Sequence, residues 1–569
     1  MPGDKCWPSP QEWKVFDDSL GGGRLIKTQP IAESCYDGPG KKNLNECAYV
    51  AKMWPDQDFQ TENPIGRPLP YNITCAPVDY AAGWVPTTCI QGQSPPYAVN
   101  VTSRSHIVKA LKFAQSRNLR ITVVSTGHDM LGRSDGYGSL EIWLRYYRKS
   151  IDFQKTFTSA TGCSAAASRW NGSAIHINGA WQWRDVHPVA QKNNVIVVSG
   201  GSVSPGATGG WPSGGGHGPA TRNYGLGADQ IIEAEVMLAN GSIVVANHCQ
   251  NTDLFRALRG GGPGYGVVLG TTIKAHPNIN VATAHRLVIA PYHQTPNNSD
   301  LLDAVTVMLQ AFPELNTAGY GGYAYWYRNL RTVLVNNATS GYSHSIWAIG
   351  KSRDEAVAAF APVRKTLSKF EDRLFINETY ITYPDYWSLY YGESGQYDPA
   401  GITWAITSRM IDPPALKDYN TVRETVDVIS GEPDQYAGNV VLLVSGGQVF
   451  VDANDRTSGL NPAWRTSPFV LATWRNPANN ATNAERKAMN DDITFVKGAA
   501  LKRLAPTTGG YMNEGDRNDP DYIQTFYGAN YQSHLAAKKK YDPGYAFYCP
   551  TCVGAEAFVD SPNGPLCRA

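Results

Sequence analysis

The sequence predicts an α+β protein with two lobes. A chain of 569 residues is longer than one ordinary hydrophobic core accommodates. Glycine is abundant, at 55 residues, and the helix-like segments are short, which favours a turn-rich α+β or α/β protein over a helical bundle. After His276-Pro277 the pattern changes to alternating strands separated by helix-like segments. We therefore expect a second lobe there, made of an antiparallel sheet covered by helices.

The balance of charge argues against two classes of partner. Lys and Arg number 50 and Asp and Glu number 49, so the chain lacks the electrostatic footprint of a protein that binds nucleic acid or an anionic membrane. No segment approaches the roughly 18 consecutive apolar residues of a membrane span. We expect no contact with nucleic acid or membrane, and a monomer.

The ten cysteines are concentrated near the ends of the chain, with five in the first 89 residues and three in the last 21. This distribution suits disulfides in an oxidising compartment, with Cys35–Cys47 and Cys75–Cys89 as plausible local pairs. The pair Cys549-Pro-Thr-Cys552 also has the spacing of two zinc ligands. No second ligand pair accompanies it, and we therefore expect no metal site.

Asn-X-Ser/Thr triplets are spread over the whole chain and suggest N-linked glycans on a secreted, extracellular protein. The segment from Met1 to Cys6 contains no apolar run, so we expect the chain to be the mature form after removal of a signal peptide. The acceptors are Asn72, Asn100, Asn171, Asn240, Asn297, Asn337, Asn377 and Asn480.

Residues 1–95 are rich in Pro, Cys and Asn and show weak periodicity, so we expect an irregular, disulfide-rich N-terminal wrap. Residues 96–277 form the next domain, which begins with a strand near Tyr97 to Val101. The apolar spacing of residues 103–117 predicts a helix with Ser103 or Ser105 as its N-cap, and residues 121–124 then form a strand.

This strand runs into a turn of small residues, Ser125-Thr126-Gly127-His128-Asp129, which continues to Ser134. Such a turn can present backbone N–H groups to a phosphate and direct the imidazole of His128 toward a bound ring. An ordinary strand-loop with an exposed histidine is the alternative.

A glycine-rich segment from Gly200 to Gly218 follows a predicted strand, helix and strand over residues 175–198. Its composition excludes a helix or a central strand and allows the backbone to approach a flat or phosphorylated ligand; a flexible linker is the alternative. The dipeptide Asn240-Gly241 between β-rich runs predicts a hairpin. A short helix over 253–258 and a strand over 267–273 complete the domain.

Residues 278–500 form the predicted second lobe, and residues 501–569 form a C-terminal segment. In the second lobe we expect strands at 284–289, 321–327, 332–335 and 440–444 and helices at 300–312 and 353–370. The C-terminal segment contains the run from Tyr511 to Asp516 and a helix over 531–540.

Several segments together resemble the secreted fungal FAD-linked oxidases of the vanillyl-alcohol-oxidase and berberine-bridge superfamily, in particular the isoamyl-alcohol-oxidase-like subgroup. The resemblance covers nearly the whole chain and is weakest between about 280 and 500. The matching segments are Cys6-Trp7-Pro8-Ser9, Thr126-Gly127-His128-Asp129, Ser213 to Gly218, Tyr224 to Asp229, Gly260-Gly261-Gly262, Tyr265 to Val268, Asn530-Tyr531, Tyr541-Asp542-Pro543 and Cys549 to Gly554.

The resemblance implies a two-lobe FAD-binding fold of the PCMH type. Its α+β flavin lobe would comprise residues 96–277, the C-terminal segment would return to that lobe, and residues 278–500 would form the substrate lobe. The implied cofactor-binding residues are Ser125, Thr126, Gly127, His128, Asp129, Met130, Gly132, Ser213, Gly214, Gly215, Gly216, Gly218, Gly225, Asp229, Gly266 and Val267.

The resemblance also implies that His128 is bonded to the 8-methyl carbon of FAD. Some relatives add a cysteine link ten residues before the Ser-Gly-Gly-Gly motif, where this chain has Val203, so we expect a single covalent link. Some relatives also have a histidine at the position of Trp211.

The implied reaction is oxidation of an alcohol or sugar-type hydroxyl of a small molecule, with hydride transfer to flavin N5 and reoxidation by O2 to give H2O2. Tyr511 and Glu514 are the candidate bases; packing for Tyr511 and a solvated loop charge for Glu514 are the alternatives. Relatives of the berberine-bridge type use an acidic base in the substrate lobe, in a region where this chain reads Asn461-Pro462-Ala463-Trp464-Arg465 and has no acid. We expect Arg465 to form a salt bridge; stabilisation of an alkoxide or carboxylate is the alternative. A flavin-dependent dehydrogenase or oxidative cyclase, and a secreted binding protein with an inactive flavin, remain alternative functions.

Overall fold

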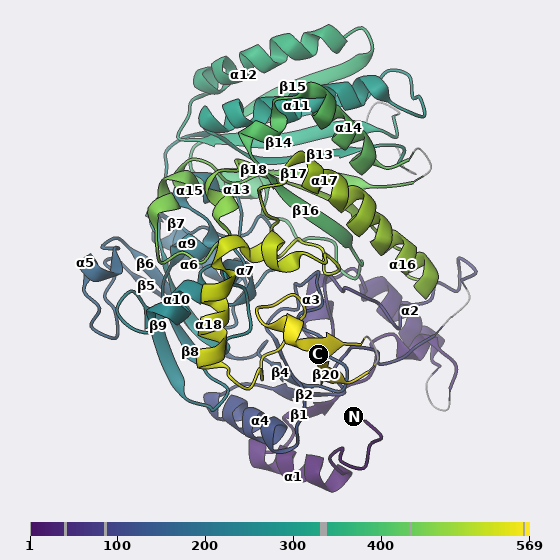
Figure 1. Ribbon diagram of the computed structural model, residues 1–569, viewed down its shortest axis with the longest axis vertical. Coiled ribbons are helices and arrows are strands. Elements are labelled where there is room, and N and C mark those ends of the chain that lie inside the picture. Colours follow the sequence, from purple (N-terminus) through teal and green to yellow (C-terminus); the bar gives the residue numbers. More distant parts are fainter. Residues whose placement is uncertain (1, 39–41, 85–87, 331–337, 433–434, 562–563) are drawn as a thin grey trace.

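The computed structural model describes residues 2–38, 42–84, 88–330, 338–432, 435–561 and 564–569. Within them the chain forms two stacked lobes, with the C-terminal segment alongside the first (Figure 1). The arrangement is the predicted α+β fold. Among the described residues, no helix combines the length and the apolar character needed to cross a lipid bilayer.

The first lobe contains a sheet of strand order β1-β2-β4-β3, in which β2, β4 and β3 are parallel. Parallel neighbours require a crossover, and α4 (Arg104–Ser116) supplies it on the predicted residues. Ser103 occupies the predicted N-cap position, although its hydroxyl does not bond to the helix backbone. The strands are β1 (Leu25–Lys27), β2 (Tyr97–Asn100), β3 (Ile121–Val124) and β4 (Leu140–Trp143).

An antiparallel sheet of order β5-β6-β10-β8-β9 completes the first lobe. The predicted hairpin is confirmed: β8 pairs with β9, and Gly241 takes a φ of +83° in the turn between them. The strands are β5 (Arg148–Gln154), β6 (Ala174–Gly179), β8 (Ile231–Met237), β9 (Ile243–Asn247) and β10 (Val267–Lys274). Flanking helices are α5 (Ala165–Ser168), α6 (Trp183–Lys192) and α10 (Thr252–Leu258).

The glycine-rich segment differs in two details from the prediction. One helical turn, α7 (Gly210–Ser213), interrupts the loop where no helix was expected, because the non-glycine run Trp211-Pro212-Ser213 is compatible with helical backbone. The strand before it, β7 (Val195–Ile196), is shorter than predicted and pairs with β11 (His276–Pro277). Two further short helices follow, α8 (Thr221–Tyr224) and α9 (Gly227–Gln230).

The second lobe contains an antiparallel sheet of order β15-β12-β14-β13-β17-β18-β16, as predicted. Helix α11 (Ser299–Thr317) packs an apolar face of Val305, Leu309 and Phe312 against it. The predicted strand at 332–335 lies outside the described residues. The strands are β12 (Ala282–Pro291), β13 (Tyr320–Tyr327), β14 (Gly341–Ile349), β15 (Leu374–Tyr383), β16 (Ala405–Ile411), β17 (Gly438–Leu443) and β18 (Phe469–Arg475). The other helices are α12 (Arg353–Leu367), α13 (Tyr386–Glu393), α14 (Tyr419–Ser430), α15 (Gln448–Val451), α16 (Asn483–Asp491) and α17 (Gly498–Leu504).

The chain then returns to the first lobe, where α18 (Tyr531–Tyr541) packs on α10 (Figure 1). Its buried Lys538 donates to Asp542 at 2.7 Å and to the Gly264 carbonyl at 2.6 Å, so one ammonium group fastens the helix to the loop before β10. The chain closes with the hairpin β19 (Phe558–Asp560) and β20 (Leu566–Arg568).

The first 95 residues are more regular than predicted. The helix α1 (Pro10–Leu20) starts at a capping box between Ser9 and Glu12 and buries Trp13, Phe16 and Leu20. These residues have the spacing of an amphipathic helix face, which the Pro and Cys content obscured. Two more helices follow, α2 (Leu44–Met53) and α3 (Gln57–Thr61).

Both predicted local disulfides, Cys35–Cys47 and Cys75–Cys89, are present. Cys549 and Cys552 also form a disulfide, so these two residues are not zinc ligands. A fourth bond joins Cys163 to Cys249. Within the described ranges, Cys6 and Cys567 are exposed and unpaired.

The buried His187 makes stability depend on pH. It packs between the ring of Trp183 in the first lobe and the rings of Trp387 and Tyr390 in the second, and burial lowers its pKa to about 3. In the unfolded chain the same group binds a proton near pH 6.5, so lowering the pH through 6.5 favours unfolding. At pH 5 this costs about 2 kcal/mol relative to pH 7. We expect the melting temperature of His187→Gln to fall less steeply than that of the wild type as the pH is lowered from 7 to 5. If the two melting temperatures fall in parallel with pH, His187 is not the source of this pH dependence.

Candidate cofactor and substrate site

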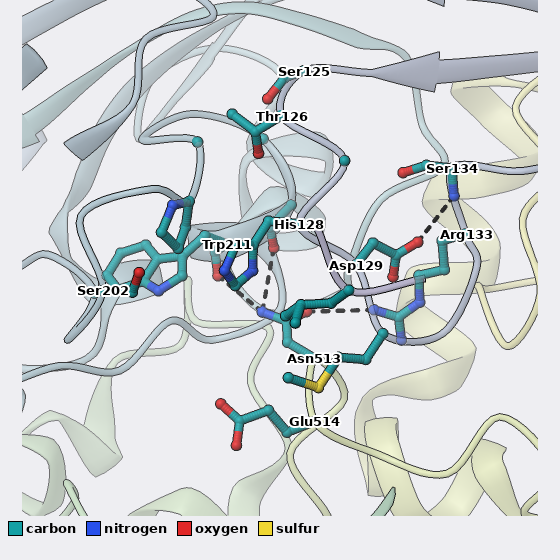
Figure 2. A pocket seen from close by; sticks show the side chains of 18 of the residues that line it. Ser125, Thr126, His128, Asp129, Arg133, Ser134, Ser202, Trp211, Asn513 and Glu514 are labelled. Carbon is teal, nitrogen blue, oxygen red and sulfur yellow. Dashed lines mark hydrogen bonds between the residues drawn. The ribbon is translucent and has the colours of Figure 1, made fainter. Parts of the chain in front are cut away.

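A cavity of about 680 Å³ lies between the two lobes and takes its walls from both. This volume is within the range of cofactor and substrate pockets. Its wall includes the turn after β3, the glycine-rich loop, strand β13 and the C-terminal segment near Glu514. Figure 2 shows that the turn, the glycine-rich loop and the C-terminal segment meet around one space.

The Asp129 side chain and the backbone of Gly127 hold the turn after β3 in place. The Asp129 carboxylate accepts hydrogen bonds from the backbone N–H of Leu131 at 3.2 Å and of Ser134 at 3.0 Å. Gly127 adopts a φ of +68°, and a Cβ there would lie 3.0 Å from the Gly66 carbonyl oxygen. Glycine is thus required at the residue that precedes His128.

Arg67, from the N-terminal wrap, supports the same turn. Its buried guanidinium donates to the carbonyls of Gly66 and Ser134 and pairs with Asp135 at 3.0 Å and Glu141 at 2.8 Å. Burial raises the pKa of Glu141 to about 7, and the attraction of Arg67 opposes that rise. The N-terminal wrap therefore anchors the turn through a buried charged cluster.

His128 lies in the cavity wall, with its side chain about 15% exposed. Its Nε2 lies 3.1 Å from the carboxylate oxygen Oδ2 of Asp398, which comes from the second lobe. Because a carboxylate can only accept, Nε2 carries the hydrogen in this bond.

The glycine-rich loop provides a part of the wall that carries no side chains, at Gly209 and Gly210. A Cβ added at Gly209 or Gly210 would meet no atom within 4 Å, and both residues line the cavity. By contrast, a Cβ at Gly206 would lie 2.7 Å from the Ser125 hydroxyl. The loop thus packs closely on the turn after β3 and leaves an open, flat surface next to it. A flat, phosphorylated cofactor fits this combination of turn and surface.

The two candidate bases from the C-terminal segment, Tyr511 and Glu514, both line the cavity but have different surroundings. Tyr511 is buried, burial raises its pKa well above the usual value, and its hydroxyl accepts a bond from Asn513 at 2.9 Å. Burial thus favours the protonated form of the Tyr511 hydroxyl, and its role as a base stays a prediction. Glu514 accepts a hydrogen bond from Nε2 of His217 at 2.9 Å, and Nδ1 of His217 lies 3.3 Å from the Tyr323 hydroxyl.

The predicted cofactor residues divide into two groups. Those that line the cavity are Ser125, Thr126, Gly127, His128, Asp129, Met130, Ser213 and Gly266. Those behind the wall are Gly132, Gly214, Gly215, Gly216, Gly218, Gly225, Asp229 and Val267. The expectation that the backbone of Gly214 to Gly216 faces the cofactor is thus corrected: a Cβ at Gly214 would meet Asn513 at 2.2 Å, and one at Gly216 would meet Trp211 at 2.8 Å. These glycines are needed for close packing.

Asp229 is also corrected, because its carboxylate pairs with Arg465 at 2.8 Å and caps α9. The salt bridge expected of Arg465 is confirmed. Val203 is buried in the core, and the neighbouring Ser202 lines the cavity in its place. Cys549 also lines the cavity, but its sulfur is held in a disulfide.

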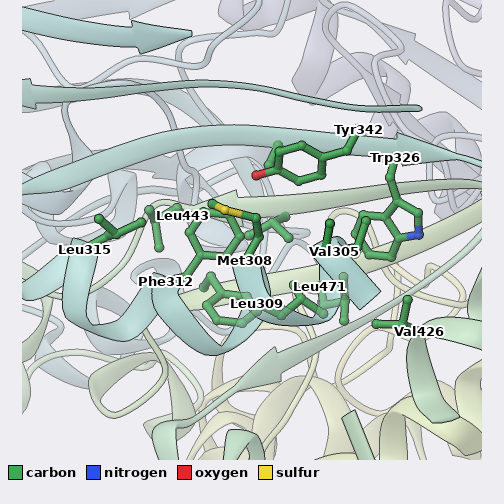
Figure 3. Close-up of a cluster of buried hydrophobic side chains, with 14 of the residues drawn as sticks. Val305, Met308, Leu309, Phe312, Leu315, Trp326, Tyr342, Val426, Leu443 and Leu471 are labelled. Atoms are coloured by element: carbon green, nitrogen blue, oxygen red, sulfur yellow. The ribbon is translucent and has the colours of Figure 1, made fainter. Parts of the chain in front are cut away.

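Several wall residues escaped the sequence analysis. Tyr323, Tyr325 and Tyr327 alternate along β13 and face the cavity, while Trp326 points to the opposite side, toward α11 (Figure 3). This alternation was visible in the sequence, because successive strand residues point to opposite faces. Asp398 had no such signal, since it lies in a loop.

Two family models match the chain in the regions that form this site. The FAD binding domain matches residues 95–247, and the model described as berberine and berberine like matches residues 510–554. Both matched segments contribute residues to the cavity wall. The two family models therefore point to this cavity as the FAD site.

Curated relatives match along the whole chain. The FAD-linked oxidoreductase hmp9 of Hypomyces subiculosus is 62% identical, and the match covers 100% of this chain and 90% of that protein. The FAD-linked oxidoreductase apf9 of Gibberella fujikuroi is 39% identical, with 100% and 96% covered.

Solved structures give the same result. The VAO-type flavoprotein MtVAO713 from Myceliophthora thermophila superposes with a TM-score of 0.98 at 60% identity, covering 100% of this chain and 99% of that one. The VAO-type flavoprotein MtVAO615 from the same fungus gives 0.85 at 26% identity, with 100% and 99% covered. The chain therefore belongs to the FAD-linked oxidoreductases of the vanillyl-alcohol-oxidase and berberine-bridge superfamily.

Proposed function

We propose that this FAD-linked oxidoreductase is an exported oxidase that carries FAD covalently bound to His128 and oxidises a hydroxyl group of a small molecule. The observation that carries the proposal is the shape of the cavity. It runs from the turn that bears His128, past the flat glycine wall, to the Glu514–His217 pair beneath the aromatic face of β13. Cofactor and substrate would thus share one cavity.

FAD supplies the two-electron acceptor for oxidation of a carbon–hydrogen bond. The protein contributes the groups that bind and orient the cofactor. Ser125 to Asp129 would hold the pyrophosphate with backbone N–H groups, and the surface of Gly209 and Gly210 would support the flat ring. His128 faces the same space and is placed to hold the ring by a covalent bond.

The Glu514–His217 pair is the proposed base. Oxidation of an alcohol requires removal of the hydroxyl proton by a group within hydrogen-bond reach. Glu514 and His217 both line the cavity, and their bond of 2.9 Å lets them share a proton. Tyr323 extends this chain toward the second lobe through its contact with Nδ1 of His217.

The wall of the second lobe favours a substrate with apolar or flat surfaces. Aromatic side chains dominate this part of the cavity, and few charged groups accompany them. An aromatic or aliphatic alcohol fits such a wall, and a sugar ring stacked on it is the other candidate. The aromatic residues are Tyr323, Tyr325, Tyr327, Trp404 and Trp474.

Two observations support export and glycosylation. Disulfides persist in oxidising compartments, and the described residues form four of them. Among the acceptor asparagines, Asn100 is half-buried and Asn337 lies outside the described residues. The exposed acceptors are Asn72, Asn171, Asn240, Asn297, Asn377 and Asn480.

The covalent bond predicts that flavin stays with the denatured protein. After acid precipitation of the wild type, we expect a yellow pellet and a colourless supernatant. His128→Ala should release all its FAD into the supernatant, while His106→Ala, a histidine outside the cavity wall, serves as the matched control and should keep the flavin in the pellet. A colourless wild-type pellet would refute the bond.

The base pair predicts a loss of catalytic rate without loss of cofactor. We expect Glu514→Gln to lower the rate of anaerobic flavin reduction at least about 100-fold, because proton transfer contributes roughly 10²–10⁴-fold. The substrate is first identified on a panel of aromatic alcohols, aliphatic alcohols and oligosaccharides that reduce the wild-type flavin. Glu393→Gln, which changes another carboxylate of the cavity wall, is the control.

An unchanged rate in Glu514→Gln would contradict the proposed base. Peroxide release on readmission of air supports an oxidase, whereas slow reoxidation by O2 would identify a dehydrogenase. A flavin that no compound reduces would favour a binding protein.

A further inference from the structure

The segment from Gly395 to Gly401 belongs to the second lobe in sequence but is fastened to the rest of the molecule along its length. It connects α13 to β16, and its residues Gln396, Asp398 and Pro399 line the cavity wall. Its partners come from the glycine-rich loop, α6 and the N-terminal wrap. The bonds are Gly395 N to Gly201 O at 2.8 Å, Val203 N to Gln396 O at 3.3 Å, Arg184 Nη1 to Tyr397 Oη at 2.6 Å, Gln57 Nε2 to Asp398 O at 2.6 Å, Gly401 N to Pro68 O at 2.7 Å and Trp54 Nε1 to Gly401 O at 2.9 Å.

This framework positions one carboxylate. The Asp398 side chain lies 3.1 Å from Nε2 of His128, and no other hydrogen bond to that carboxylate occurs in the described part of the chain. Its backbone carbonyl is held by Gln57, so the carboxylate is directed by a fixed main chain. With an exposed fraction of 47%, the side chain also remains in contact with solvent, which allows it to exchange protons.

The bond determines which nitrogen of His128 can react. A carboxylate that accepts from Nε2–H fixes the tautomer in which Nδ1 carries the lone pair. The side chain lines the cavity, and Nδ1 has no hydrogen-bond partner among the described residues. An aspartate that holds an imidazole in one tautomer and stabilises it while the other nitrogen reacts is a recurring arrangement in enzymes.

We propose that Asp398 is the positioning residue for covalent attachment of FAD, an inference that rests on the proposed bond to His128. It directs Nδ1 toward the 8-methyl carbon and accepts the Nε2 proton as the bond forms. One C–H bond of the methyl group and one N–H bond of His128 break, and one C–N bond forms. The two electrons and the proton from the methyl group remain on the flavin, and Asp398 passes the Nε2 proton to solvent. Molecular oxygen then takes up the two electrons, the flavin proton and one proton from solvent to form hydrogen peroxide.

The variants separate proton transfer from anchoring. Asp398→Asn keeps the size and a hydrogen-bond acceptor for Nε2 but cannot take up the proton. Tyr397→Phe removes the bond from Arg184 in the same segment and keeps the carboxylate. In protein from parallel cultures, we expect the ratio of acid-stable to acid-released flavin to fall at least ten-fold in Asp398→Asn. We expect Tyr397→Phe to match the wild type and Asp398→Glu to recover part of the ratio.

A second measurement uses the wild type and does not depend on how the variants fold. The flavin peptide is isolated after proteolysis, and the linked nitrogen of His128 is identified by nuclear magnetic resonance. Attachment through Nδ1 is the expected result, and attachment through Nε2 would overturn the proposal, because Asp398 occupies that nitrogen.

The outcomes separate the two proposals. If the wild type contains no covalent flavin, the bond to His128 is wrong and Asp398 has no such role. If the wild type is fully linked and Asp398→Asn is equally so, the bond to His128 stands and the inference about Asp398 is refuted. If Asp398→Asn retains no flavin, its ratio of linked to released flavin cannot be measured. The linked nitrogen of the wild type then tests the inference: Nδ1 supports it and Nε2 refutes it.

Discussion

The geometry of the site depends on one turn, the residues from Ser125 to Ser134 after β3. Its backbone is fixed by the left-handed conformation of Gly127, by the Asp129 carboxylate and by the buried charges around Arg67. A loop that had to be ordered by its ligand would lose conformational entropy on binding, whereas this turn is held before the ligand arrives. The direction of the His128 side chain follows from that rigidity.

The turn also explains why distant parts of the chain are needed for one site. Arg133 donates to the Met512 carbonyl and thereby joins the turn to the C-terminal segment that carries Glu514. Asp398 joins it to the second lobe. The N-terminal wrap, which lies outside the cavity for most of its length, supports both contacts through Arg67 and Gln57. These contacts join the lobes at the cofactor cavity, in addition to the hydrophobic core that the two lobes share around Trp347 and Trp387.

Local sequence patterns predicted much of this fold, and the reasons are specific. The strand-turn that carries His128, the hairpin at Asn240-Gly241 and the helix α4 are each encoded by neighbouring residues. Close packing defeated the prediction for Gly214 and Gly216, because composition does not show whether a glycine makes room for a ligand or for a side chain. Asp398 was beyond prediction, since its place is set by bonds to residues hundreds of positions away.

The central claim is that the rigid turn presents His128 to FAD inside the cavity. Proteolysis of the holoenzyme followed by mass spectrometry of the peptides tests it most directly. We predict that the peptide containing His128 carries the mass of the flavin nucleotide and that its fragments assign that mass to His128. An unmodified His128 peptide recovered in full yield, or the flavin mass on another residue, would contradict the account.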